Sequence, residues 1–182
     1  MKTKKLIPLI AAVVAASLLP AALSAQDTRP SFDGVAVRGA AKTFVKKLCQ
    51  KGWTATDPEN HVYVLTGTWD DHENVTLTVL EDERSKKVTD IGVIIPCVPA
   101  WDDISATWRD VVDTFSGTWG PPSLTQTQFH GGGTGDDTKK LVLIQTGKCD
   151  WRARWDLRGG SAVTSVAFIA FQFCILTTIS AE

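Results

Sequence analysis

Apolar residues recur at steps of three and four in two segments of the chain, and this spacing predicts two amphipathic helices. The first helix lies within residues 39–52, with lysines in its last turn and a glycine after it. Its apolar face consists of Ala41, Phe44, Val45 and Leu48. The second helix lies within residues 101–119, with two aspartates in its first turn and a Gly-Pro-Pro sequence at its end. Its apolar face consists of Trp101, Ile104, Trp108, Val111, Val112, Phe115 and Trp119.

Alternation of apolar and polar residues predicts a run of antiparallel strands after each helix. In one strand Val75, Leu77 and Val79 alternate with threonines, and in another Trp151, Ala153 and Trp155 alternate with charged residues. The strands predicted after the first helix are 62–69, 74–80 and 87–96, and those after the second are 125–129, 140–147 and 150–157. Polar tips separate them, which is typical of hairpins.

The C-terminal residues 159–181 contain no charged residue, and two interpretations of them compete. Residues 161–179 are apolar enough for a membrane-spanning helix, which is the first interpretation. However, threonines and Gln172 interrupt the segment, and Phe171, Phe173 and Ile175 alternate as strand residues do. We therefore expect two strands, about 161–168 and 171–178, at the centre of the sheet.

These elements together predict an α+β fold. Each half, about 26–98 and 99–182, consists of one helix followed by antiparallel strands. We expect the two units to form one continuous sheet within a single domain, with both helices on one face. The other face would meet water or a partner.

The first 25 residues have the layout of a cleaved secretory signal peptide: three lysines, an apolar stretch and small residues before the cleavage point. This predicts an exported protein, which in a bacterium would be periplasmic or secreted, and no membrane attachment is expected after cleavage. Residues 26–182 contain 16 basic and 20 acidic residues, a net charge of −4. Because phosphate backbones require a basic surface, nucleic acid is not expected as a partner.

Four cysteines follow the signal peptide, and an even number in an oxidising compartment indicates disulfides. None of them has the close spacing of a redox motif or a zinc knuckle. Four cysteines allow three pairings, and their positions favour one bond in each half: Cys49 with Cys97, and Cys149 with Cys174.

Residues 130–140, HGGGTGDDTKK, resemble the backbone-donor loop of lipases and esterases. The chain lacks the Gly-x-Ser-x-Gly nucleophile motif that accompanies such a loop. The segment also does not match the Gly-x-x-x-x-Gly-Lys-Ser/Thr pattern of a phosphate-binding loop. We therefore interpret the segment as a hairpin tip, with His130 at a strand end or on the surface. No catalytic residue and no cofactor are predicted.

A second polar tip contains Trp69, Asp70, Asp71 and His72, which are the candidate partner-binding residues. An aromatic ring beside carboxylates could anchor a sugar or a protein, although packing of Trp69 into the core is the alternative. The segment lacks the spacing and glycine of a calcium loop, so no metal site is predicted.

Three segments carry a resemblance to a known group of proteins. They are SFDGVAVRGAAKTFVKKLCQKGW (31–53), LTGTWDDHENVTLTVL (65–80) and TFSGTWGPPS (114–123). They resemble uncharacterised small exported proteins of Bacteroides-type bacteria. These in turn are similar to the tandem helix-plus-sheet folds of the beta-lactamase-inhibitor-protein-like and PepSY-like groups. The resemblance implies a periplasmic protein whose sheet face grips another protein, and it transfers no catalytic residue.

The sequence therefore favours an exported, soluble, non-enzymatic binding or inhibitor-like module whose partner is an unknown protein or envelope component. Two alternatives stay open. One is a small envelope hydrolase or metal-dependent enzyme that uses His130, His72 and nearby carboxylates. The other is an envelope protein anchored by residues 161–179.

Overall fold

A computed structural model describes residues 28–131 and 135–182. The predicted signal peptide, residues 1–25, lies outside the described residues. Three helices and ten strands follow one another in the described chain. In order they are β1 (Ser31–Phe32), β2 (Val35–Ala36), α1 (Ala41–Cys49), β3 (Thr54–Ala55), β4 (Val62–Trp69), β5 (His72–Glu81), β6 (Val88–Pro96), α2 (Trp101–Trp119), β7 (Leu124–Phe129), α3 (Asp137–Gln145), β8 (Cys149–Leu157), β9 (Gly160–Ile169) and β10 (Gln172–Ala181).

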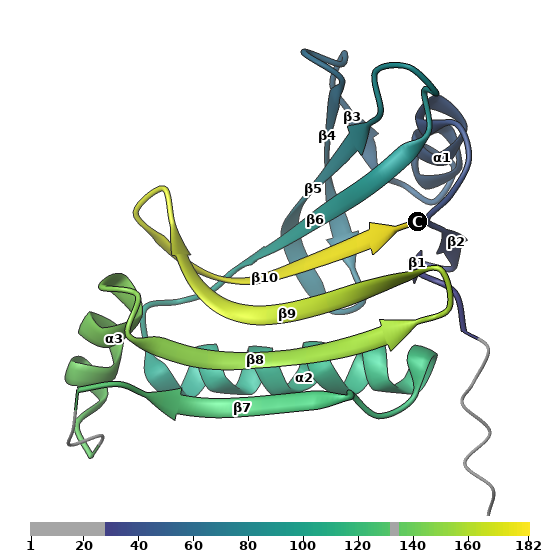
Figure 1. The fold of residues 1–182 in the computed structure, drawn as a ribbon. Helices are drawn as coiled ribbons and strands as arrows, with labels where there is room; N and C mark the ends of the chain where they lie inside the picture. Colours follow the sequence, from purple (N-terminus) through teal and green to yellow (C-terminus); the bar gives the residue numbers. More distant parts are fainter. Residues whose placement is uncertain (1–27, 132–134) are drawn as a thin grey trace, which may run out of the picture.

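Eight strands form one antiparallel sheet in the order β3-β4-β5-β6-β10-β9-β8-β7, and β1 and β2 form a separate hairpin (Figure 1). The predicted α+β class with an antiparallel sheet is therefore confirmed. The two C-terminal strands are also confirmed, and they occupy the centre of the sheet. β10 pairs with β6 from Cys174 opposite Pro96 to Ser180 opposite Asp90, so this pairing joins the C-terminal strand to a strand from the middle of the chain. No helix in the described ranges has both the length and the apolar character needed to cross a membrane.

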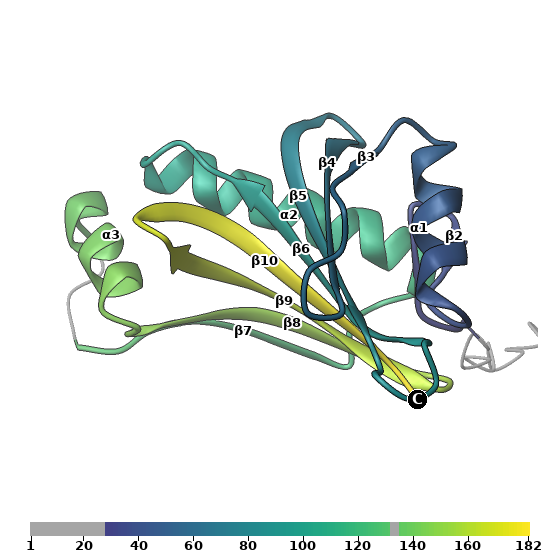
Figure 2. The same ribbon diagram turned by 90° about the horizontal axis from the view of Figure 1, so that it is seen from above.

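The two predicted helices form because each has one apolar face to bury. α1 buries Ala41, Phe44, Val45 and Leu48 and contacts β2, β3 and β5. α2 contacts β8, β9 and β10. Figure 2 shows the helices and the sheet from above. Two aspartates in the first turn of α2 complement the positive end of the helix dipole. Its buried residues are Trp101, Ile104, Ser105, Trp108, Val111, Phe115 and Trp119.

Residues 140–147 correct a prediction, because most of them belong to the helix α3 rather than to a strand. The Asp136 side chain caps this helix by accepting a hydrogen bond from the Thr138 N–H at 2.9 Å. Leu143 and Ile144 are buried where α3 packs on α2, β8 and β9. The apolar run LVLI fits a strand or a helix equally well, and the cap and this packing favour the helix. β7 and β8 remain paired across the insertion.

Buried side chains of neighbouring strands line up across the sheet in transverse rows. In one row Leu77, Val93 and Thr177 lie opposite one another, and the row continues to Thr164 on β9. The hydroxyls of Thr164 and Thr177 are 2.8 Å apart, so each buried oxygen has a hydrogen-bond partner. Tryptophans complete the core: Trp53, Trp69, Trp101, Trp108, Trp119 and Trp155 are buried, and Trp151 packs against them.

The predicted disulfides Cys49–Cys97 and Cys149–Cys174 are wrong, because all four cysteines lie among the described residues and are free thiols. β9 lies between the strands of Cys149 and Cys174, so two strand spacings, about 9.6 Å, separate them. A disulfide requires Cα atoms within about 7 Å. Burial raises the pKa of the Cys97, Cys149 and Cys174 thiols to about 11.

The other predicted pair fails for a related reason. Ala40 bridges Lys87 at the start of β6, whereas Cys97 follows the opposite end of that strand. Nine strand residues extend about 30 Å, whereas the nine residues of α1 extend only about 13 Å. Cys49 at the end of α1 therefore does not reach Cys97.

Candidate functional site

The predicted partner-binding residues form the turn between β4 and β5, but the ring of Trp69 is not on the surface. Only 6% of Trp69 is exposed. Its ring centre lies 5.0 Å from that of Phe115 on α2 and 5.3 Å from that of Phe32 on β1. Trp69 therefore joins α2 and the β1–β2 hairpin to the sheet, and its ring is not available to a ligand in this arrangement.

The polar residues of the same turn hold it against α2. His72 Nε2 lies 2.9 Å from a carboxylate oxygen of Asp110, and the Thr114 hydroxyl donates to Asp70 at 3.1 Å. Asp71 is exposed. Two of the three polar candidates thus have partners within the molecule, and their contacts are those of a packed hairpin.

His130 directly follows the last residue of β7, as expected of a strand-end histidine, and pairs with an aspartate on β8. Its Nε2 lies 2.6 Å from a carboxylate oxygen of Asp150, and both side chains are about half exposed. This hydrogen bond is the main cause that lowers the pKa of the Asp150 carboxyl, with a smaller contribution from Arg152. Residues 132–134 of the glycine-rich segment lie outside the described residues. His130 and Asp150 thus form a hydrogen-bonded pair on the surface of the molecule.

The turn between β9 and β10 has the most exposed aromatic side chain of the described chain. Ile169 pairs with Gln172, which leaves Ala170 and Phe171 as a two-residue turn. Phe171 is 97% exposed, and both turn residues have positive φ, 50° for Ala170 and 65° for Phe171. Such hairpin turns require positive φ at both positions, which asparagine and glycine adopt most readily. Alanine and phenylalanine are therefore strained here.

Other apolar side chains are exposed beside this turn. Ile169 is 38% exposed at the end of β9. Val98, 64% exposed, follows Cys97, whose backbone N–H donates to the Phe173 carbonyl at 2.9 Å. We call Phe171, Ile169 and Val98 the hairpin patch. Figures 1 and 2 both place the β9–β10 turn and α3 at the same end of the molecule.

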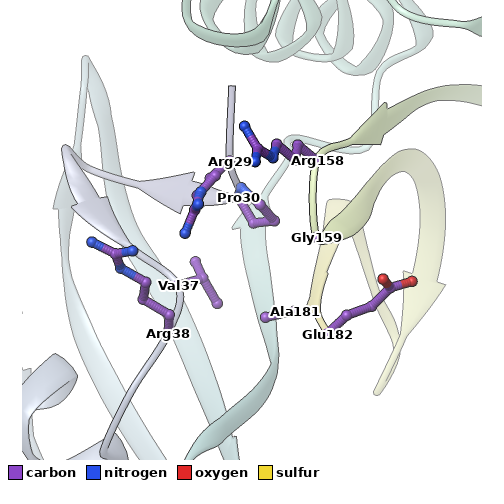
Figure 3. Close-up of a pocket in the computed structure, with 8 residues that line it drawn as sticks. All are labelled: Arg29, Pro30, Val37, Arg38, Arg158, Gly159, Ala181 and Glu182. Carbon is purple, nitrogen blue, oxygen red and sulfur yellow. The ribbon is translucent and has the colours of Figure 1, made fainter. Parts of the chain in front are cut away.

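A pocket at a different place in the fold is lined by three arginines that are far apart in the sequence (Figure 3). Arg29 precedes β1, Arg38 follows β2, and Arg158 lies between β8 and β9. The volume of this arginine pocket is about 240 Å³. The remaining lining residues are Pro30, Val37, Gly159, Ala181 and Glu182. In Figure 3 the guanidinium group of Arg38 lies apart from that of Arg158, and the Glu182 carboxylate points away from both.

Backbone contacts fix the walls of the arginine pocket. The Val37 N–H donates to the Pro30 carbonyl at 2.9 Å, and the Glu182 N–H donates to the Gly159 carbonyl at 3.1 Å. A Cβ atom on the neighbouring Gly160 would lie 2.1 Å from the Ser180 oxygen and 2.7 Å from Pro30. Only glycine at this position lets Pro30, and with it Arg29, approach the end of the sheet.

The sequence reasoning missed the arginine pocket and the hairpin patch. The pocket depends on the β1–β2 hairpin docking at the ends of β9 and β10, which no local pattern encodes. The patch had a local signal, since the predicted strands 161–168 and 171–178 implied a two-residue turn. That prediction placed the turn at residues 169–170 and Phe171 in a strand, whereas the turn consists of Ala170 and Phe171.

No group of three or more histidine, cysteine, aspartate or glutamate side chains in residues 28–131 and 135–182 is placed to hold a metal ion. Comparisons of the chain with protein-family models, with curated proteins and with solved structures each found no match.

Proposed function

We propose that this chain is an exported, non-catalytic binding module that holds a protein partner through the hairpin patch. The observation that carries the proposal is the 97% exposure of Phe171 at the tip of a strained turn. Buried aromatic side chains supply a large part of the binding energy of protein interfaces, and they act by filling a pocket on the partner.

The backbone of the turn supports this role. A residue other than glycine in the left-handed region costs about 1 to 2 kcal/mol. Ala170 and Phe171 both have that conformation, and the Phe171 ring gains little from packing because it is almost fully exposed. The strained turn therefore lowers the stability of the fold and exposes an aromatic ring to solvent. Backbone strain of this kind is expected at functional sites.

The charges next to the hairpin patch in the sequence favour a protein over a membrane surface. Residues 159–181 contain no charged residue, and the nearest charges after Val98 in the sequence are Asp102 and Asp103, both exposed. Binding to an anionic membrane requires clustered lysine and arginine. An apolar pocket with a basic rim on a protein would complement both the ring and these carboxylates.

We also propose that α1 and α2 cover the same face of the sheet and that the chain consists of two helix-and-strands units. The support is that the buried residues of both helices belong to one hydrophobic core. The opposite face then stays open, with Thr78, Gly92 and Thr178 side by side across three strands. This open face would flank the hairpin patch in a complex.

The decisive experiment places a photocrosslinking amino acid at position 171 of the exported chain in its own cells. The matched control places it at Leu124, which is 43% exposed on the edge strand β7. The expected result is one partner protein that is captured at position 171 and not at position 124. Capture of the same set of proteins at both positions, or no capture at 171, would overturn the proposal.

The variant Phe171→Gly separates binding from folding. Phe171→Gly should raise the free energy of unfolding by up to about 1 kcal/mol, because glycine tolerates a positive φ. The same variant should no longer copurify with the captured partner.

Export is tested by the mass of the protein released by osmotic shock, which should correspond to residues 26–182. Release of the uncleaved chain, or retention in the membrane, would contradict export of a soluble module.

A further inference from the structure

We propose that the edge strand β7 is an interaction surface for a second copy of this chain, with the two β7 strands paired antiparallel about a two-fold axis. This pairing joins the two eight-stranded sheets into one. The surface is separate from the hairpin patch, and the inference does not depend on the proposed function. Four features support it: the unpaired outer side of β7, its lack of edge protection, the protected opposite edge and a self-complementary sequence.

The outer side of β7 has backbone groups without a partner strand. β7 is the last strand in the order of the sheet, and it forms the lower border of the sheet in Figure 1. The His130 N–H donates to the Lys148 carbonyl at 2.9 Å, so His130 directs its backbone groups toward β8. Residues of an antiparallel strand alternate in this respect. Thr125, Thr127 and Phe129 therefore direct their N–H and C=O groups outward, where a second strand can pair with them.

β7 has none of the features by which sheet edges usually prevent pairing with another chain. Such features are a very short strand, a β-bulge, a proline or a charged residue, most often lysine. β7 has six residues, and its register with β8 is continuous from Leu124 opposite Arg154 to Phe129 opposite Cys149. Residues 123–129 contain no proline and no charged residue. An edge of this kind is a template for a further strand.

The opposite edge of the sheet is protected. β3 consists of only two residues, and a proline and two acidic residues follow it within residues 57–59. The Thr56 N–H donates to the Val64 carbonyl at 2.9 Å, so this segment covers part of the outer side of β4. A two-fold pair of β7 strands therefore leaves no second open edge, and association stops at two copies.

The sequence of β7 is compatible with its own copy. A two-fold axis at Thr127 places this residue opposite its symmetry mate and places Thr125 opposite Phe129 of the second copy. Threonine pairs, and pairs of an aromatic with a β-branched residue, are favourable across antiparallel strands. On the other face of the sheet Gln126 lies opposite Gln128, and each amide has both donors and acceptors. Because β7 has no charged residue, no like charges meet within the paired strands.

The first test measures the mass of the purified mature chain, residues 26–182, by sedimentation equilibrium. One short strand from each copy is a small interface, so we expect a monomer–dimer equilibrium in the micromolar range. The average mass should rise with concentration and level off at two copies. A chain that is still monomeric at submillimolar concentration, or a mass that continues to rise beyond two copies, would overturn the proposal.

Charged variants of Thr127 locate the contact. Thr127→Lys places two like charges opposite each other at the axis and should weaken dimerisation at least about tenfold. Thr127→Glu should have the same effect, whereas an equal mixture of the two variants should recover a dimer, because opposite charges then meet. Thr54→Lys is a matched change of an exposed threonine on the other edge strand, β3, and it should dimerise like the natural chain.

The mixture separates a direct contact from a damaged fold, because two misfolded variants do not restore each other. Thermal melting of each variant alone should be unchanged. Three results contradict the pairing of β7: dimerisation of Thr127→Lys at the natural strength, a mixture that stays monomeric, or an equal loss in Thr54→Lys.

Hydrogen exchange of single amides provides a second readout. The amides of Thr125, Thr127 and Phe129 point away from β8, so their exchange should slow as the concentration rises. The amides of Gln126 and Gln128 point toward β8 and should be protected at every concentration. Concentration-dependent protection at the hairpin patch in place of β7 would show a dimer that forms elsewhere.

In cells, a photocrosslinking amino acid at Leu124 identifies what occupies the edge. It should capture a second copy of the chain, because in this register Leu124 lies opposite His130 of the second copy. Capture of a different protein alone would assign the edge to another partner and would overturn the proposal.

Discussion

The His130–Asp150 pair is the clearest case in which a single contact sets the chemistry of a side chain. His130 Nε2 and Asp150 Oδ2 are 2.6 Å apart, and this hydrogen bond is the main cause that lowers the pKa of the Asp150 carboxyl. The pKa of Asp150 is lower in the folded chain than in the unfolded chain. The contact therefore stabilises the fold fully when the pH is above the pKa of the unfolded chain. This stabilisation is lost as the pH falls through the folded value.

Removal of the imidazole should reverse that shift. In His130→Ala the pKa of Asp150 should rise toward the ordinary value of about 3.9. NMR titration of the carboxyl carbon measures it directly. Asp156 is a control in the same spectrum, because its pKa is lowered first by the hydrogen bond from Arg154 and should not change. An unaltered Asp150 pKa in the variant would show that the pair does not form in solution.

At the scale of elements, α3 depends on a cap that the hydrophobic pattern could not reveal. Asp136→Ala removes the acceptor for the Thr138 N–H and should destabilise the helix by about 1 kcal/mol, whereas Asp136→Asn should be nearly neutral. Hydrogen exchange of the α3 amides measures this locally. Asp137→Ala is the matched control, since it removes a first-turn carboxylate and its pair with Lys140 at 2.8 Å but leaves the cap in place. Equal losses in the two variants would contradict a capping role.

The same element shows where sequence reasoning succeeds and fails. Helices α1 and α2 and the long strands were predictable, because each has a continuous apolar face whose period identifies it. α3 has only four consecutive apolar residues, so its period is ambiguous and tertiary packing decides. The sequence correctly predicts that Trp69 lies beside a polar tip. Its burial could not be predicted, because the ring is covered by α2 and β1, which are distant in the sequence. The arginine pocket depends likewise on contacts between distant segments.

At the scale of the molecule, the pairing of β6 with β10 decides whether the chain is one folding unit. Residues 90–96 of the first half pair with residues 174–180 of the second, and no residue of that ladder is adjacent to its partner in the sequence. Ile179 is fully buried and lies opposite Ile91 on β6 and Ala162 on β9. A cavity at this position therefore weakens both halves at once.

The expected result is one unfolding transition that shifts as a whole. Ile179→Val should cost about 0.5 to 1.5 kcal/mol and Ile179→Ala about 2 to 5 kcal/mol. Hydrogen exchange monitored by mass spectrometry should show equal losses of protection in β5 and in β8, which lie on opposite sides of the β6–β10 pair. Ile169→Ala, at the exposed end of β9, should cost much less. Loss of protection in β8 and β9 alone would show two units that unfold separately, and the continuous sheet would then not be a single cooperative structure.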